Sequence, residues 1–259
     1  MSYDFDNAYV ALVCDSTTID ECYWVRTNVS TGERIKIGKV TVNEVFKDFT
    51  TVQGETYKSS IFGNNTFTNT TELIKIDYED IFLFDGERQL KIRFNPSMSG
   101  IHETIMETKT DTIGSKYPFF FRNGDVCYRD FTLGGLVSFH MDEQRLFSIY
   151  GVEDQPTRGR TYTPMPEGVT DFSLPTDLTG KNFTHERKFR EEVLKWLNNG
   201  EIKLFRSPSE GIMLVRLMGC SMSPDQTTTR MIYSFSCQAY EAAGHEYEDL
   251  LKYKIYNLS

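Results

Sequence analysis

Residues 184–218 read THERKFREEVLKWLNNGEIKLFRSPSEGIMLVRLM, and this stretch decides the fold that we expect. Thr184 can cap a helix, and Glu186 stands in the first turn, where the helix dipole favours an acid. Apolar residues then recur at spacings i, i+4, i+7 and i+8, at Phe189, Val193, Trp196 and Leu197. Asparagine and glycine at 198–200 are typical of a helix end. The pattern predicts one amphipathic helix whose apolar face packs on a sheet.

The residues after this helix predict strands. Residues 201–206 and 212–218 are apolar runs on either side of a turn-rich loop. Residues 230–240 alternate, with serines on one face and the opposite face formed by Tyr233, Phe235 and Cys237. Residues 246–255 are expected to form a short second helix.

The first 150 residues predict a series of short strands. Residues 33–42 alternate between apolar and polar side chains, with a turn expected at Gly38, and residues 72–84 are dense in apolar residues. Residues 89–94 alternate cleanly, which indicates a half-buried strand. We expect Asn95-Pro96 to end that strand, because proline cannot continue a ladder of backbone hydrogen bonds.

A hairpin is predicted around Asn123-Gly124. The β-prone runs 116–122 and 125–129 flank this dipeptide, and a type I′ turn requires two residues with positive φ. Residues 133–141 predict another strand, in which Gly134-Gly135 indicates a bulge or a close approach of two backbones.

We expect three parts in the chain: a β-rich half over residues 1–150, a proline-rich connecting arm over 151–183, and a helix with strands over 184–259. The arm has poor periodicity and contains four of the eight prolines, at Pro156, Pro164, Pro166 and Pro175. Either it packs on something else or it divides two halves of the fold. The predicted fold class is mainly β (α+β), with one amphipathic helix packed on the sheet.

Composition and charge narrow the possible partners. The chain of 259 residues is 39% hydrophobic and 25% charged, as is usual for soluble globular proteins. Its formal charge of −9 repels phosphates, so nucleic acid is not expected as a partner of the surface as a whole. Five acids precede the first basic residue, Arg26, and no apolar run reaches the length of a membrane span. We therefore expect synthesis in a cytosol, no targeting signal and no membrane insertion.

The sequence contains none of the common catalytic motifs. The five cysteines lack CxxC spacing and are interpreted as reduced, small apolar residues. No metal site is expected from the scattered histidines, which are His102, His140, His185 and His245. The acids of residues 77–80 are interpreted as solvated rather than as a glycosidase pair. The Asn/Thr-rich segment 64–69 fits a sugar-binding loop and a plain turn equally well. We expect no catalytic residue and no cofactor.

Three consecutive phenylalanines mark a candidate interface. Side chains at Phe119, Phe120 and Phe121 cannot all enter one core, because neighbours on a strand point to opposite faces. Either both faces are covered, or one ring contacts a partner. Together with Pro164 and Pro166 of the connecting arm, these residues are the predicted interface.

A longer series of segments has a recognisable order. A helix ending in Trp-Leu is followed by three strand-like segments, and an aromatic block precedes it; the segments are 107–114, 117–124, 133–139, 189–197, 203–208, 213–218 and 233–240. This series resembles bacteriophage tail proteins of the distal-tail and baseplate-hub kind. The chain departs from a standard distal tail protein in two ways: it lacks a clear second, carbohydrate-module-like domain, and its proline-rich stretch is long.

The resemblance implies a β-sandwich or barrel of the tail-tube type. It also implies a structural protein of the virion that forms a ring, usually hexameric, around the tail channel and contacts other tail or baseplate proteins. DNA would at most pass through that channel. The position in the tail stays open between tube end, hub and adaptor. Two other hypotheses are a glycan-binding β-sandwich module of a tail and, with least support, a wall hydrolase.

Overall fold

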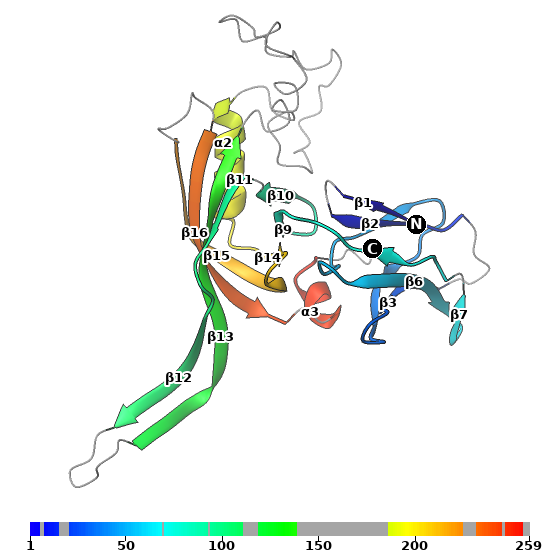
Figure 1. Ribbon diagram of the computed structural model, residues 1–259, viewed down its shortest axis with the longest axis horizontal. Helices are drawn as coiled ribbons and strands as arrows, with labels where there is room; N and C mark the ends of the chain where they lie inside the picture. The colour runs from blue at the N-terminus through cyan, green and yellow to red at the C-terminus, as the bar shows by residue number, and fades with distance from the viewer. Residues whose placement is uncertain are drawn as a thin grey trace, which may run out of the picture.

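The protein is mainly β, with antiparallel sheets and few helices (Figure 1). The computed structural model describes residues 1–5, 8–15, 21–68, 70–92, 94–110, 119–138, 186–224, 232–244 and 247–255. The two helices among these residues are α2 (Glu186–Leu197) and α3 (Tyr247–Lys252).

The N-terminal strands form two small sheets. The first has the order β1-β2-β5 and consists of β1 (Ser2–Asp4), β2 (Tyr9–Val13) and β5 (Val45–Asp48). The second has the order β4-β3-β6-β7, with β8 also paired to β6. It consists of β3 (Tyr23–Asn28), β4 (Arg34–Lys39), β6 (Thr56–Gly63), β7 (Thr66–Thr68) and β8 (Ile74–Lys75).

The largest sheet has eight strands in the order β10-β9-β14-β15-β16-β13-β11, with β12 paired to β13. Its strands are β9 (Ile81–Phe84), β10 (Gln89–Ile92), β11 (Phe94–Met98), β12 (His102–Thr110), β13 (Phe119–Ser138), β14 (Ile202–Ser207), β15 (Gly211–Pro224) and β16 (Ile232–Ala243). Strands from before and after the connecting segment therefore lie in one sheet, because β9 pairs with β14 and β13 pairs with β16.

Both faces of this sheet are covered near β9. Ile81 and Leu83 belong to the apolar core beneath α2, whereas Phe82 and Phe84 belong to the core shared with the N-terminal sheets. The alternation follows from the two-residue period of a strand. A strand with both faces covered is apolar throughout, and this explains the dense apolar run that the sequence shows at its centre.

Helix α2 packs its apolar side on the eight-stranded sheet. The side chains predicted to form that side are buried, with exposed fractions of 0%, 0%, 3% and 1% at Phe189, Val193, Trp196 and Leu197. Gly200 follows the helix with φ of 76°, a conformation that glycine adopts without strain. Thr184, the predicted cap, lies outside the described residues.

A buried arginine of β14 joins the large sheet to the N-terminal sheets. The Arg206 side chain is only 1% exposed, and its Nη1 donates hydrogen bonds of 2.6 Å to the backbone oxygens of Ala8 and Phe49. The guanidinium carbon also lies 5.1 Å and 5.0 Å from the ring centres of Tyr78 and Phe82. Hydrogen bonds and aromatic faces thus stabilise a charge that would be costly to bury alone.

The prediction of a hairpin turn at Asn123-Gly124 was wrong. Strand β13 runs through this dipeptide, and its hairpin partner is β12. The pairing shifts register there, from Ile105 opposite Cys127 to Glu107 opposite Arg122. Pairing with β12 on both sides of the dipeptide outweighs the local turn preference, so Asn-Gly becomes an irregularity within the strand.

Two other predicted breaks also lie inside strands. Asn95-Pro96 is within β11, where the register with β13 shifts between Phe94 and Ser97, and proline is tolerated at such a bulge on the last strand of a sheet. Gly38 is within β4, and a Cβ there would lie 2.3 Å from the ring of Phe46. Gly38 is therefore required because the Phe46 ring packs against its backbone, and the predicted turn at this position was wrong.

Candidate assembly interface

Strands β12 and β13 extend away from the body as a two-stranded ribbon (Figure 1). We call residues 102–110 and 119–130 the ribbon. Strand β16 pairs with β13 only from Asp130 onward, so within the described residues the earlier part of β13 pairs with β12 alone. At about 3.4 Å per residue, the nine residues of β12 span roughly 30 Å.

The ribbon has no core beneath it in the described part of the chain. Nearly all described side chains of β12 are exposed. They include Ile105, which is 39% exposed, and across the ribbon Val126 on β13 is 47% exposed. An isolated two-stranded hairpin is at best marginally stable in water. The ribbon thus presents backbone and apolar groups that a neighbouring protein surface can cover.

Hydrogen bonds of Arg129 hold the base of the ribbon against strand β16. Its Nε and Nη2 donate hydrogen bonds of 2.9 Å and 2.6 Å to the two carboxylate oxygens of Glu241 on β16. The hydrogen bonds to Glu241 raise the pKa of Arg129 above its ordinary value. Nearby, Thr104 donates a 2.9 Å hydrogen bond to Asp130 across the two ribbon strands.

The predicted phenylalanines lie on this ribbon. Phe119, Phe120 and Phe121 begin β13 and pair with Thr110, Lys109 and Thr108 of β12. The structure therefore brings them to the outer end of the ribbon's paired region. Pro164 and Pro166 lie outside the described residues. The sequence interpretation missed β12, although its run His102–Thr110 contains β-prone threonine and isoleucine residues that could have indicated a strand.

A second exposed apolar surface lies on the first N-terminal sheet. Val13 and Val45 are direct cross-strand partners on β2 and β5, and Val42 adjoins them through its bridge to Cys14. Their exposed fractions are 45%, 55% and 39%. We call Val13, Val42 and Val45 the valine patch. In Figure 1, strand β2 lies on the opposite side of the body from the ribbon.

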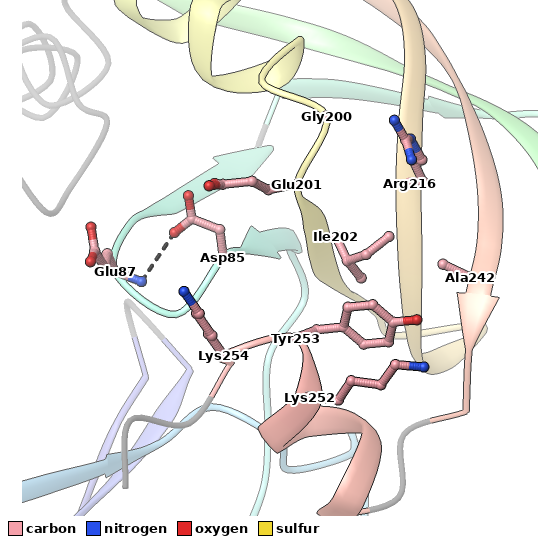
Figure 2. A pocket seen from close by; sticks show the side chains of 10 residues that line it. All are labelled: Asp85, Glu87, Gly200, Glu201, Ile202, Arg216, Ala242, Lys252, Tyr253 and Lys254. Carbon is pink, nitrogen blue, oxygen red and sulfur yellow. Dashed lines mark hydrogen bonds between the residues drawn. The ribbon is translucent and has the colours of Figure 1, made fainter. Parts of the chain in front are cut away.

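A hollow of about 670 Å³ lies beside α3 (Figure 2). Its charged lining residues carry both signs and are Asp85, Glu87, Glu201, Arg216, Lys252 and Lys254. In Figure 2 the acids Asp85 and Glu87 lie at one end, and Arg216 and Lys252 lie at the other. Such a mixture complements a protein surface better than a small ion of one sign.

The acids and the histidine that the structure describes do not form a catalytic or metal-binding cluster. Asp80 forms a 3.0 Å ion pair with Lys91, and Glu79 is exposed. Among the described residues, no group of three or more histidine, cysteine and acidic side chains could hold a metal ion. Of the four histidines, only His102 is described, and it lies on β12.

Segment 64–69, which was considered as a sugar-binding loop, begins with a tight turn. Asn64 and Asn65 have φ of 48° and 58° and connect β6 to β7. Positive φ at both positions is typical of a two-residue hairpin turn. Asn69 lies outside the described residues, so the segment is described only as far as Thr68.

No protein-family model matches the sequence, and no curated protein matches it either. No helix among the described residues is both long and apolar enough to cross a membrane.

Proposed function

We propose that this protein is a structural subunit of a bacteriophage tail or baseplate that acts by oligomeric assembly. The observation that carries the proposal is the ribbon, which leaves the body with no covering layer formed by the described residues. The ordered series of segments that resembles distal-tail and hub proteins supports the same class.

The ribbon is suited to contact a neighbouring subunit. Among the described residues, the outer part of β13 pairs with β12 and with no third strand, so each of these two strands has a second edge where another chain can add a strand. Natural proteins cover or charge such edges because an open edge promotes aggregation. Edge pairing would add main-chain hydrogen bonds, and exposed Ile105 and Val126 would add apolar contact.

The valine patch supplies a second, different surface. A head-to-tail contact joins two unlike surfaces, and it closes into a ring when the rotation between subunits allows. We propose that the ribbon of one subunit and the valine patch of a neighbouring subunit both become buried in such a ring, usually of six subunits in this class. The net charge of −9 favours protein partners over nucleic acid, so DNA would only pass through the ring.

The proposal is tested by the size and shape of the purified protein. We expect light scattering to give a defined oligomer and negative-stain images to show rings. Ile105→Asp and Val45→Asp should each reduce the oligomer, because a charge would be placed in an apolar contact. Val29→Asp is the matched control, because Val29 is also 46% exposed but belongs to neither surface.

A protein that stays monomeric at every concentration, and that antibodies fail to detect on virions, would contradict the proposal. Equal loss of assembly in Val29→Asp would also count against it, because it would indicate a general effect of the added charge.

A further inference from the structure

Cys220 and Cys237 face each other across β15 and β16. The register of these strands pairs Met218 with Gln238 and Ser221 with Ser236. Gly219 and Cys220 together therefore oppose the single residue Cys237. This is a β-bulge, and the positive φ of Gly219, 62°, is typical of the G1 type, whose first residue is a glycine in the left-handed region.

The bulge turns Cys220 towards the core. Met213, Val215 and Leu217 point into the core beneath α2, so an unbroken alternation would send the side chain at position 220 to the other face. The extra residue reverses this parity, and Cys220 packs against the same core as buried Cys237.

Both thiols belong to the core beneath α2, and the Cys220 thiol lies under the end of that helix. Each side chain lies on the face of the sheet that α2 covers. The Cys220 thiol also donates to the backbone oxygen of Leu197, and the Cys237 thiol to that of Leu133, each at 3.5 Å. Regularly paired residues of antiparallel strands have Cα atoms about 4.5–5.5 Å apart, and a disulfide spans Cα separations of about 4.4–6.8 Å, so a bulged residue beside its partner is within reach of a disulfide.

A buried lysine lies beside the pair. Lys203 on β14 is 0% exposed, and its Nζ donates a 2.7 Å hydrogen bond to Asn199 and lies 4.4 Å from the Trp196 ring centre. Acidic groups that act on this lysine are Asp85 and Glu201. The neighbouring Cys237 thiol and then the Lys203 charge lower the pKa of Cys220, whereas the neighbouring Cys220 thiol and burial raise the pKa of Cys237.

We propose that Cys220 and Cys237 are a redox pair, which closes to a cross-strand disulfide when the protein meets a low-molecular-mass disulfide such as oxidised glutathione. Cys220 is the attacking group, because it is partly exposed while Cys237 is buried. Lys203 is a positioning residue that favours the Cys220 thiolate.

The reaction balances in two exchange steps. The Cys220 thiolate attacks one sulfur of oxidised glutathione, and the first glutathione leaves as its thiolate. The Cys237 thiol loses its proton to solvent, and its sulfur attacks the Cys220 sulfur, so that the second glutathione leaves. The protein loses two hydrogens and two electrons, and one oxidised glutathione becomes two reduced molecules.

The product would join β15 to β16 and close a loop over residues 221–236. Cross-linking lowers the entropy of the unfolded chain, so the oxidised protein should unfold at a higher temperature than the reduced protein. The evidence for the pair comes from the sheet register and from the burial of the two side chains, and it does not depend on the proposed assembly.

The test treats the full chain with oxidised glutathione under native conditions and digests it without reduction. We expect a Cys220–Cys237 cross-linked peptide, an intact mass lower by two hydrogens, and reversal by dithiothreitol. Cys220→Ser should abolish the cross-link. Cys127→Ser is the matched control, because Cys127 is an exposed thiol on the ribbon and its loss should leave the cross-link intact.

Lys203→Met tests the positioning role through the rate of cross-linking. Without the Lys203 charge the pKa of Cys220 should rise, and the rate at neutral pH should fall by about threefold, because the smaller thiolate fraction is partly offset by higher nucleophilicity. The pH at which the rate is half-maximal should rise as well, a change that a merely structural role of Lys203 would not produce.

A wild-type protein that forms only a stable mixed disulfide of Cys220 with glutathione, or that links other cysteines, would overturn the redox pair. An unchanged rate and pH profile in a folded Lys203→Met variant would overturn the role of Lys203.

Discussion

Arg129 and Glu241 meet through two nearly parallel hydrogen bonds at the point where the ribbon leaves the body, one from Nε at 2.9 Å and one from Nη2 at 2.6 Å. The Arg129 backbone nitrogen donates a third hydrogen bond, of 3.1 Å, to the same carboxylate. A planar guanidinium matched to a carboxylate limits both distance and direction. The pair therefore orients the ribbon relative to β16.

Arg129→Lys should loosen the base of the ribbon with little loss of global stability. Lysine keeps the charge but cannot form the paired hydrogen bonds, and Arg129 is 39% exposed, so the cost should stay below about 1 kcal/mol. We expect faster hydrogen exchange in residues 102–110 and weaker assembly. Arg88→Lys, which alters the 3.7 Å pair with Glu192, is the control and should leave the ribbon unchanged.

Trp196→Ala should destabilise the protein by about 3–5 kcal/mol, because it leaves a cavity between α2 and the sheet. Trp196→Phe fills most of that space but removes the hydrogen bond from the indole nitrogen to Asp85, so a smaller loss of about 1.5–3 kcal/mol is expected. Urea unfolding followed by circular dichroism measures both. An unchanged unfolding midpoint in Trp196→Ala would contradict the placement of α2.

Gly134→Ala should weaken the pairing of β13 with β16. A Cβ at this position would lie 2.8 Å from the backbone oxygen of Phe235, so one strand must shift. We expect a loss of about 1–3 kcal/mol in thermal or urea unfolding, as for overpacked sites. Gly100→Ala is the control because no atom lies within 4 Å of its added Cβ. Similar stability of the two variants would argue against the close approach.

Stability should rise with pH above 8 because of Lys203. Burial lowers its pKa from 10.5 to about 8 in the folded protein. Between these values the unfolded chain holds a proton that the folded protein has lost, so the free energy of unfolding increases by at most about 3 kcal/mol. Lys203→Met should have a flatter profile between pH 8 and 10. Equal slopes for the variant and the wild type would contradict this assignment.

The ionisation of Tyr3 limits the pH range in which the effect of Lys203 on stability can be measured. Burial raises the pKa of Tyr3 from 10.0 to about 12. A raised pKa stabilises the fold fully below pH 10, and that contribution is lost as the pH rises through 12. The comparison of Lys203→Met with the wild type therefore belongs below pH 10. A Tyr3→Phe variant should lose less stability than the wild type between pH 10 and 12.

Elements with a strong local pattern agree with the sequence predictions. Residues 89–92 form β10 with Leu90 and Ile92 buried at 1% and 0%, as their alternation predicts. Helix α3 occupies 247–252 within the predicted segment 246–255. In each case one apolar face and its period are enough to specify the element.

Which strands pair with one another could not be predicted from the periodicity of their side chains. Besides its neighbour β10, strand β9 pairs with β14, and the register joins Leu83 to Phe205, more than a hundred residues later. The face that Cys220 presents depends on a bulge that only its partner strand defines. Periodicity carries no information about which strand lies alongside.

By itself, the sequence determined the mainly β character of this protein, the amphipathic helix and the faces of its most regular strands, because side-chain periodicity is a local property. Only the tertiary structure decided that β13 continues through Asn123-Gly124 and extends with β12 as a ribbon. The reason is energetic, because the hydrogen bonds and contacts along the whole of β12 outweigh the turn preference of two residues. The free energy of this pairing depends on both strands and cannot be obtained from either segment alone.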